Sequence, residues 1–385
     1  MKIPAKTKNN SNKNKFFYFP YVLILSAMFS VFLVYNASST YAYNNFGNSY
    51  YFLINQSIWF TVSLFVFFIL QKLKVSLIEK NLTIIFFVTV FLLVLVVLPT
   101  PFSLNIYGAR RWLILNPMGV LPEVPFMGRL TLQPSELFKF VLCLFLPKVL
   151  LNNLRLGEKK AFLKSLLYLG IPAFLVLIEP DLKDFIILVL IGISILFVSN
   201  INLKYFLSGV PIILVLFVLL ILVAPYRFER LKTYIGGGTE LGSSYHVKQI
   251  NIALGSGGVF GVGIGRSVQK NEYLPEVMGD SIFAVYAEEF GFLGSVTLIL
   301  LILLLIYTLF KMFMAINSVY YSLYSVGIFT WISTQSVINL GSISGLIPLT
   351  GVPLPLISYG GSSLVFTIAG LSLAYRFYKE DLKRV

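Results

Sequence analysis

The chain has 385 residues, of which 57% are hydrophobic and only 12% charged, a balance too apolar for an ordinary soluble globular protein. A net charge of +14 at pH 7 could indicate an acidic partner such as nucleic acid, but the basic residues lie at the ends of apolar runs. This placement fits anionic lipid headgroups rather than nucleic acid. The single cysteine, Cys143, excludes an intramolecular disulfide. The composition therefore predicts an all-α polytopic membrane protein.

A tail rich in lysine and asparagine comes first, and the apolar run after it is too long for the core of a cleaved signal peptide. Ten apolar stretches are candidates to cross the hydrocarbon, which takes about 20 helical residues at ~1.5 Å each. They form a single membrane domain over residues 17–377, between cytoplasmic tails at 1–16 and 378–385. We place the spans at residues 17–36, 52–71, 82–99, 136–151, 162–179, 184–200, 203–224, 282–310, 317–340 and 358–377.

The distribution of lysine and arginine predicts the orientation of these spans. Both tails are basic, whereas the connector 38–50 contains neither residue. About ten transmembrane helices with both termini in the cytoplasm satisfy this pattern. The loops 100–135 and 225–281 and the connector 341–357 then face outside, and the largest loop lies between spans 7 and 8.

The loop 225–281 is too long for a structureless connection and too rich in glycine and apolar residues for a charged disordered segment. Asp280 lies where this loop meets the eighth span. It is either the N-cap of that helix or, with a pKa raised by partial burial, a general base. Glu276, four residues earlier, competes for the second role.

Carboxylates also occur inside predicted spans, where an uncompensated charge is costly. Glu136 and Lys139 are three residues apart and share a helix face. They are either a packing ion pair or a polar patch in a substrate groove. Glu288 and Glu289 form either a structural hydrogen bond to a neighbouring helix or the wall of a wet cavity.

Basic and aromatic residues of the outer loops are candidates to bind phosphate. Arg110, Arg111 and Trp112 suit either interfacial anchoring or a phosphate clamp, because arginine offers a planar fork of donors. Further cations for the same task are Arg266, Lys270, Arg227 and Arg230.

Other kinds of site lack their expected sequence signals. The glycine run 255–265 lacks the Gly-Lys-Ser/Thr ending of a nucleotide-binding loop. His246 has no cysteine or histidine at ligand spacing, so a zinc site is not expected, and no metal-ligand cluster is present in the sequence.

Taken in chain order, the polar motifs resemble those of the FtsW/RodA (SEDS) family of cell-wall polymerases, over nearly the whole chain beyond the basic tail. The matching segments are 108–112 (GARRW), 133–139 (QPSELFK), 179–182 (EPDL), 252–263 (IALGSGGVFGVG), 269–270 (QK), 273–276 (YLPE), Asp280 with 283–285 (FAV), 287–291 (AEEFG) and 351–363 (GVPLPLISYGGSS).

The resemblance implies a peptidoglycan glycosyltransferase that polymerises lipid II, a polyprenyl-diphosphate-linked disaccharide-pentapeptide, at the outer face of the membrane. Asp280 corresponds to the essential aspartate of the family, which would deprotonate the 4-hydroxyl of the acceptor sugar. That oxygen would then attack the anomeric carbon of the donor with inversion. The expected substrate-binding residues are Glu136, Lys139, Arg110, Arg111, Trp112, Arg266, Lys270, Glu276, Ser358 and Ser362.

The residues Gln269 and Lys270 ahead of segment 273–276 resemble the division branch, FtsW, more than the elongation branch, RodA. The expected partners are therefore lipid II, membrane lipids, a class B penicillin-binding protein (a transpeptidase) and other division proteins, at the septum of a bacterial cytoplasmic membrane. The sequence identifies no cofactor, and a divalent cation is a candidate to share the charge of the leaving group.

Three departures from the family pattern stand out. Met278-Gly279 replaces the common His-Thr before the key aspartate and leaves it without a polar neighbour on that side. Lys183-Asp184 replaces Gly-Thr or Gly-Ser, and residues 116–129 look like an inserted loop or hairpin.

Three alternatives stay open at this point. They are a lipid II flippase that uses the same polar interior, a RodA-type elongation polymerase, and an inert division scaffold. Against the flippase, no inverted repeat or pair of broken helices is evident in the sequence.

Overall fold

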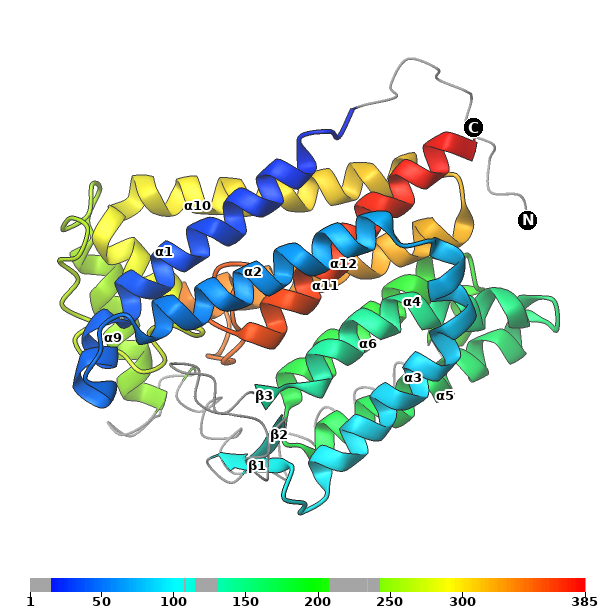
Figure 1. Cartoon of the computed structure of the whole chain (residues 1–385), viewed down its shortest axis with the longest axis horizontal. Coiled ribbons are helices and arrows are strands. Elements are labelled where there is room, and N and C mark those ends of the chain that lie inside the picture. Colours follow the sequence, from blue (N-terminus) through cyan, green and yellow to red (C-terminus); the bar gives the residue numbers. More distant parts are fainter. Residues whose placement is uncertain (1–14, 107–108, 115–130, 208–233, 235–242, 385) are drawn as a thin grey trace.

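The computed structural model describes residues 15–106, 109–114, 131–207, 234 and 243–384. Long helices pack against one another as a bundle, shown in Figure 1. They are α1 (Phe19–Phe46), α2 (Tyr51–Lys72), α3 (Val75–Val97), α4 (Pro134–Leu154), α5 (Glu158–Ile178), α6 (Leu182–Val198), α10 (Ile282–Ala315), α11 (Val319–Ile343) and α12 (Gly361–Arg384), with the shorter α9 (Ser243–Ser256) before α10.

Nine of the ten predicted spans coincide with these long helices. The remaining one, the seventh span at 203–224, extends beyond the described residues. Among the described helices, α1, α2, α3, α4, α5 and α10 are long and apolar enough to cross a membrane, while the others are shorter or more polar. Large apolar side chains such as Phe65, Phe91 and Phe174 are more than half exposed. Such an outer surface suits lipid chains, so the prediction of an all-α membrane bundle is confirmed.

Helix α4 occupies the middle of the bundle. It contacts α3, α5 and α6 on one side and α11 and α12 on the other. Its side chains from Phe138 to Leu146 are buried except for Phe140, which is half-buried, and they join one apolar core with Phe86 and Trp331. In Figure 1, α12 ends toward one end of the bundle, while α9 and the start of α10 lie at the other.

A small antiparallel sheet follows α3, in the region predicted as a plain outer loop. Strands β1 (Ser103–Ile106), β2 (Ala109–Ile114) and β3 (Thr131–Leu132) pair in the order β1-β2-β3. Strands of two to six residues are too short for a reliable period-2 pattern, which explains why the sequence did not predict them. The inserted segment 116–129 lies outside the described residues, but β3 runs directly into Gln133 and α4.

Helix α10 is broken at Gly291, whose φ of 67° and ψ of −164° are not helical. The glycine-rich loop after α9 fills the break with backbone hydrogen bonds. The amides of Val262 and Gly263 donate to the carbonyls of Glu288 and Glu289 at 3.0 and 3.1 Å. The amides of the two residues after Gly291 donate to the carbonyls of residues 258 and 259 at 2.9 and 3.2 Å. Groups freed by the break are therefore satisfied without water.

Candidate active site

Asp280 is 8% exposed and lies at the junction of the outer loop and α10. The N-cap of α10 is Ser281, which itself makes no side-chain capping bond. The Asp280 carboxylate is therefore not the helix cap, which was one of the two readings that the sequence left open. Instead, a Cβ atom built on Gly351 would lie 3.6 Å from Asp280 Oδ2, so this oxygen faces the connector between α11 and α12.

An imidazole from a distant segment lies beside Asp280. His246 of α9 is 9% exposed, and its Nε2 is 2.7 Å from Ser281 Oγ. Ser281 Oγ is in turn 3.5 Å from Asp280 Oδ1. The departure at Met278 and Gly279 therefore does not leave the aspartate alone, because a serine and a histidine reach it from the other direction.

Glu276 belongs to the same group. Its Oε2 is the nearest atom, at 3.3 Å, to a Cβ built on Gly279, and its carbonyl accepts hydrogen bonds from the amides of Gly279 and Ser281. Burial and the neighbouring Asp280 raise the pKa of Glu276, while Lys183 and His246 act in the opposite direction. Two carboxylates, an imidazole and an ammonium group thus share one electrostatic environment.

The connector between α11 and α12 is tied to this loop through its backbone. Asn339 Nδ2 donates to the carbonyl oxygens of Asp280 and Val352 at 2.8 and 2.7 Å. The amide of Tyr359 donates to the carbonyl of Met278 at 2.8 Å. Asn339 is completely buried, so these bonds hold the main chain of Asp280 in a fixed position.

Glu136 and Lys139 form the ion pair that their spacing predicts, with Lys139 Nζ 2.8 Å from Glu136 Oε1. The same ammonium group lies 3.1 Å from Asp184 Oδ1, and Ser135 Oγ donates to Asp184 Oδ2 at 2.6 Å. All four residues are buried. Asp184, which belongs to the second departure from the family pattern, is thus a central member of this cluster.

Lys183 connects the two groups of carboxylates. Its Nζ donates to the carbonyl oxygen of Gly351 at 2.9 Å, beside Asp280. Its charge acts on Glu276 on one side and on Glu136 and Asp184 on the other. This lysine therefore offsets negative charge that Lys139 alone does not balance.

The residues 109–112 of the GARRW segment lie on β2, and the first glycine of the segment lies outside the described residues. Arg111 donates to the carbonyl oxygens of Glu179 and Pro180 at 3.2 and 2.6 Å, and its Nε lies 3.7 Å from Asp181 Oδ2. Arg110 and Trp112 are half-buried on the same strand. Arg111 thus joins the sheet to the α5–α6 connection, and the phosphate role of these residues stays a prediction.

A second polar cluster surrounds the break in α10. Lys270 Nζ lies 2.8 Å from Glu289 Oε1 and 3.2 Å from Asn36 Oδ1, and Asn36 donates to Glu289 from α1. Glu288 accepts bonds from Ser267 and from the amide of Val268. Of the two readings of Glu288 and Glu289, the structure shows the hydrogen-bonded one.

The remaining predicted residues lie in two settings. Arg266 is exposed, whereas Lys270 is buried and already paired. Ser358 Oγ accepts from the amide of Leu354 at 2.8 Å, and Ser362 Oγ accepts from the amide of Gln133 at 3.2 Å. Both serines therefore hold backbone in place near the site, and their contact with substrate stays a prediction.

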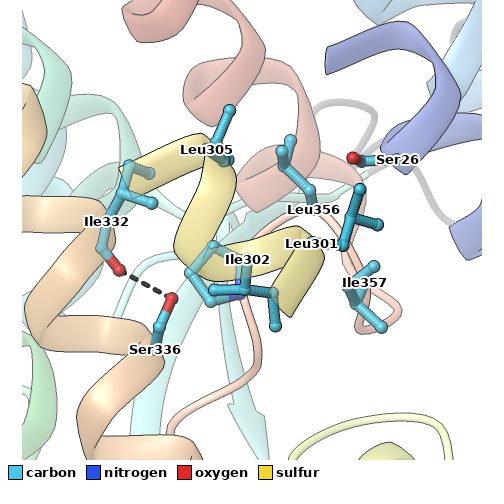
Figure 2. A pocket seen from close by; sticks show the side chains of 9 residues that line it. Ser26, Leu301, Ile302, Leu305, Ile332, Ser336, Leu356 and Ile357 are labelled. Carbon is cyan, nitrogen blue, oxygen red and sulfur yellow. Dashed lines mark hydrogen bonds between the residues drawn. The ribbon is translucent and has the colours of Figure 1, made fainter. Parts of the chain in front are cut away.

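Asp280 lines neither of two hollows in the described part of the bundle. Figure 2 shows the first, an apolar gap beside α10 and α11, where Ser336 Oγ donates to the carbonyl of Ile332 at 2.8 Å. The second is an open depression along α9 between Ser244 and Ile252.

Within the described ranges, no group of three or more histidine, cysteine, aspartate or glutamate residues is arranged to hold a metal ion. The role of a divalent cation stays a prediction.

Sequence reasoning missed His246, Lys183 and Asp184 as members of the site. In the structure, the buried residues of α9 recur at helical spacing, His246, Gln249, Ile250 and Ala253. Only Ile250 and Ala253 are apolar, so the sequence carries a weak signal that the histidine faces inward. No local signal indicated that Ser281 is its partner, because 35 residues separate them.

The chain matches known proteins over nearly its full length. A family model described as "Cell cycle protein", which covers FtsW, RodA and SpoVE, matches residues 17–382. The chain is 32% identical over 375 residues to the probable peptidoglycan glycosyltransferase FtsW of Buchnera aphidicola, covering 92% of this chain and 94% of the relative. It is 31% identical over 355 residues to the stage V sporulation protein E of Bacillus subtilis, covering 91% and 93%.

Two solved structures share the fold. A chain from a peptidoglycan synthase complex, described as coordinating polymerization and crosslinking, has a TM-score of 0.72 and 26% identity, with 94% of this chain and 98% of that chain covered. The rod shape determining protein RodA of Thermus thermophilus has a TM-score of 0.64 and 27% identity, covering 93% and 96%. With the family model, these similarities show that the chain belongs to the FtsW/RodA/SpoVE family of membrane proteins.

Proposed function

We propose that this protein is a peptidoglycan glycosyltransferase that polymerises lipid II at the outer face of the bacterial cytoplasmic membrane. The observation that carries the proposal is the setting of Asp280. Its carboxylate is buried, is not used as a helix cap, and sits on main chain that Asn339 holds in place. A base held in this way loses little entropy on reaching its reactive geometry.

In the proposed reaction, Asp280 removes the proton from the 4-hydroxyl of the acceptor sugar. The hydroxyl oxygen attacks the anomeric carbon of the donor from the face opposite the diphosphate. The polyprenyl diphosphate then leaves with the electrons of the broken bond. Lys183, whose ammonium group binds the carbonyl oxygen of Gly351 next to Asp280, is a candidate to stabilise the negative charge of the leaving group. Arg110 and Arg111 on β2 are further candidates for this charge.

The names of the relatives support a proposal for the setting in the cell. Many of them are named FtsW, and this similarity supports septal wall synthesis during division. One structural neighbour comes from a complex that joins polymerization and crosslinking. We therefore propose a class B penicillin-binding protein as the partner, and a topology with both termini in the cytoplasm.

The test is polymerisation of lipid II by the purified protein in detergent, with and without a class B penicillin-binding protein. Because no leaflets exist in detergent, glycan strands can come only from a polymerase and not from a flippase. Asp280→Asn keeps the size of the side chain but removes the base, and the rate is expected to fall about 10²-fold or more with the protein still folded. Glu276→Gln is the matched control in the same loop.

The outcomes separate the candidate roles. Wild-type strands, lost in Asp280→Asn and retained in Glu276→Gln, support the assignment. A dead Glu276→Gln variant beside an active Asp280→Asn variant would transfer the role of base to Glu276. Lipid II left unpolymerised by the wild-type protein with its partner would refute the polymerase.

A further inference from the structure

We propose that His246 is the second proton acceptor of the reaction, which takes the proton from Asp280 through the hydroxyl of Ser281. The inference rests on the proposed glycosyl transfer and assigns a role to a residue outside the segment that carries the base. It makes α9 a part of the catalytic apparatus rather than a cover for α10.

The geometry supplies a continuous path. His246 Nε2 and Ser281 Oγ are 2.7 Å apart, which is the distance of a strong hydrogen bond. Ser281 Oγ and Asp280 Oδ1 are 3.5 Å apart, at the long limit. Hydrogen bonds of a catalytic site are often long before substrate binds and shorten in the reactive complex.

The hydroxyl of Ser281 has no other structural task in helix α10. Ser281 occupies the N-cap position, where a serine side chain commonly accepts a bond from the first turn, yet this bond is absent. Both bonds recorded for its hydroxyl instead involve His246 and Asp280. The side chain is completely buried, so the hydroxyl exchanges protons with its protein neighbours rather than with bulk water.

The proton is accounted for at each step. The acceptor O–H bond breaks and its proton passes to the Asp280 carboxylate, while the new glycosidic bond forms and the diphosphate leaves as an anion. Protonated Asp280 then donates to Ser281 Oγ. The Ser281 hydrogen, which points to Asp280 Oδ1 before the reaction, turns and passes to Nε2 of His246, in the neutral tautomer that carries its hydrogen on Nδ1. Asp280 is again a carboxylate, and the imidazolium releases the proton to water before the next addition.

The charges around the imidazole favour such a role. Glu276 and Asp280 lie on the loop that faces it, with Lys183 of α6 beyond them and Lys248 exposed on its own helix. A polymerase repeats the same step many times without releasing its strand, so the base must be regenerated quickly. A histidine suits this task because a neutral imidazole binds a proton more tightly than an ordinary carboxylate, so the transfer from protonated Asp280 to His246 is favourable, while the imidazolium still releases its proton near neutral pH.

The experiment compares His246→Gln and Ser281→Ala with the wild-type protein in lipid II polymerisation across pH 5 to 9. Glutamine keeps a hydrogen-bonding group next to Ser281 but cannot accept a proton, and alanine at 281 removes no capping bond. Each variant is expected to lower the turnover rate about 10- to 100-fold with little change in lipid II binding. Lys248→Gln, which removes an exposed base from the same helix, is the matched control.

Two readouts distinguish a proton acceptor from a merely structural contact. In the wild-type protein the rate falls at low pH as His246 becomes protonated, and in His246→Gln this fall is expected to move to lower pH. The double variant is expected to be no slower than either single variant, because both remove one path.

If the losses in turnover rate of the two single variants added in the double variant, or if the pH profile were unchanged in His246→Gln, the proposed proton transfer from Asp280 to His246 would be wrong. Near-normal turnover in Ser281→Ala beside a slow His246→Gln would overturn the path through the serine. Absence of polymerisation by the wild-type protein would instead count against the proposed function, so the two failures are distinguishable.

Discussion

Lys139 lies between the carboxylates of Glu136 and Asp184 at 2.8 and 3.1 Å, and its side chain is completely buried. A single ammonium group thus compensates two buried carboxylates, with Lys183 nearby to offset the remainder. Desolvation makes such a cluster costly to form, but removing one member is costlier still because it leaves an uncompensated buried charge. The sequence left Glu136 and Lys139 as either a packing ion pair or a polar patch in a substrate groove. In the structure they form a buried ion-pair network, and Lys183 connects this network to the group around Asp280.

Lys139→Met is expected to destabilise the protein by about 3–5 kcal/mol, because both carboxylates lose their partner. Thermal unfolding in detergent would measure the loss as a lowered Tm. Adding Glu136→Gln and Asp184→Asn to Lys139→Met should recover most of it. A triple variant no more stable than Lys139→Met would contradict the ion-pair account.

Glu276 predicts a dependence of stability on pH with a definite sign. Its pKa in the folded protein is raised above 4.5, first by burial and then by Asp280. A raised pKa means that the folded state holds the proton more tightly than the unfolded state, so this contribution to stability is present below pH 4.5 and is lost as pH rises through the folded pKa.

Glu276→Gln should therefore raise the Tm relative to wild type near neutral pH, with the difference shrinking as pH falls toward 4.5. Glu276 is partly exposed to solvent, which screens the effect and keeps it small. Tm measured in detergent at a series of pH values provides the check. A Tm difference that is constant across pH would show that the carboxyl is not perturbed as described.

At the scale of elements, the broken helix α10 is the feature that positions the loop that carries Asp280. The part of α10 before Gly291 begins just after Asp280 and Ser281 and carries Glu288 and Glu289 at its end. The glycine loop bonds to the broken backbone, and the Lys270–Glu289 pair joins it to α1 through Asn36. The short first segment of α10 is therefore fastened at both ends.

This fastening requires glycine at the points of closest approach. A Cβ on Gly261 would lie 2.1 Å from the carbonyl oxygen of Glu289, and one on Gly291 would lie 2.3 Å from the amide nitrogen of Gly261. Both glycines also have positive φ, of 84° and 67°. The family motif in this loop thus has a steric reason that its sequence alone did not reveal.

Gly261→Ala is expected to cost more than about 2 kcal/mol, since backbone strain of 1–3 kcal/mol adds to the clash with Glu289. Its yield in the membrane and its Tm in detergent should both fall. Gly255→Ala is the control, because this position on α9 has open space around its Cβ and helical backbone. Equal Tm values for the two variants would show that the close approach is not as described.

At the scale of the whole molecule, the two ends of the bundle differ in what they carry. The site, α9 and the start of α10 lie at one end, and α12 finishes toward the other (Figure 1). This arrangement agrees with the alternation of basic and uncharged connectors along the chain. Which end of the bundle faces the cytoplasm is predicted by the excess of lysine and arginine in cytoplasmic connectors, here called the charge rule.

The charge rule predicts that α9 faces outside and the α4–α5 connection faces the cytoplasm. An impermeant maleimide should label Lys248→Cys in intact cells but Lys159→Cys only after lysis, since both positions are exposed. The single native cysteine, Cys143, is buried and gives little background. Labelling of Lys159→Cys in intact cells, with Lys248→Cys protected, would invert the proposed orientation.

The sequence by itself determined the class of fold, the approximate position of nine described spans and the segment that holds Asp280. These features depend on local properties. Hydropathy over about 20 residues decides whether a helix is stable in lipid, and charge at its ends decides its direction. The spacing of Glu136 and Lys139 likewise predicted their contact, because residues three apart on a helix are neighbours whatever the fold around them.

Only the tertiary structure decided which polar residues meet across the bundle. Asp184 joins Lys139 from another helix, Lys183 reaches Gly351, and His246 reaches Ser281. In an apolar bundle each buried polar group needs a hydrogen-bonding or charged partner, but the sequence does not distinguish among the many pairings that would provide one. Packing of α6, α9 and α11 against the loop that carries Asp280 selects one set of pairings. That selection depends on distances between elements, which no local sequence pattern encodes.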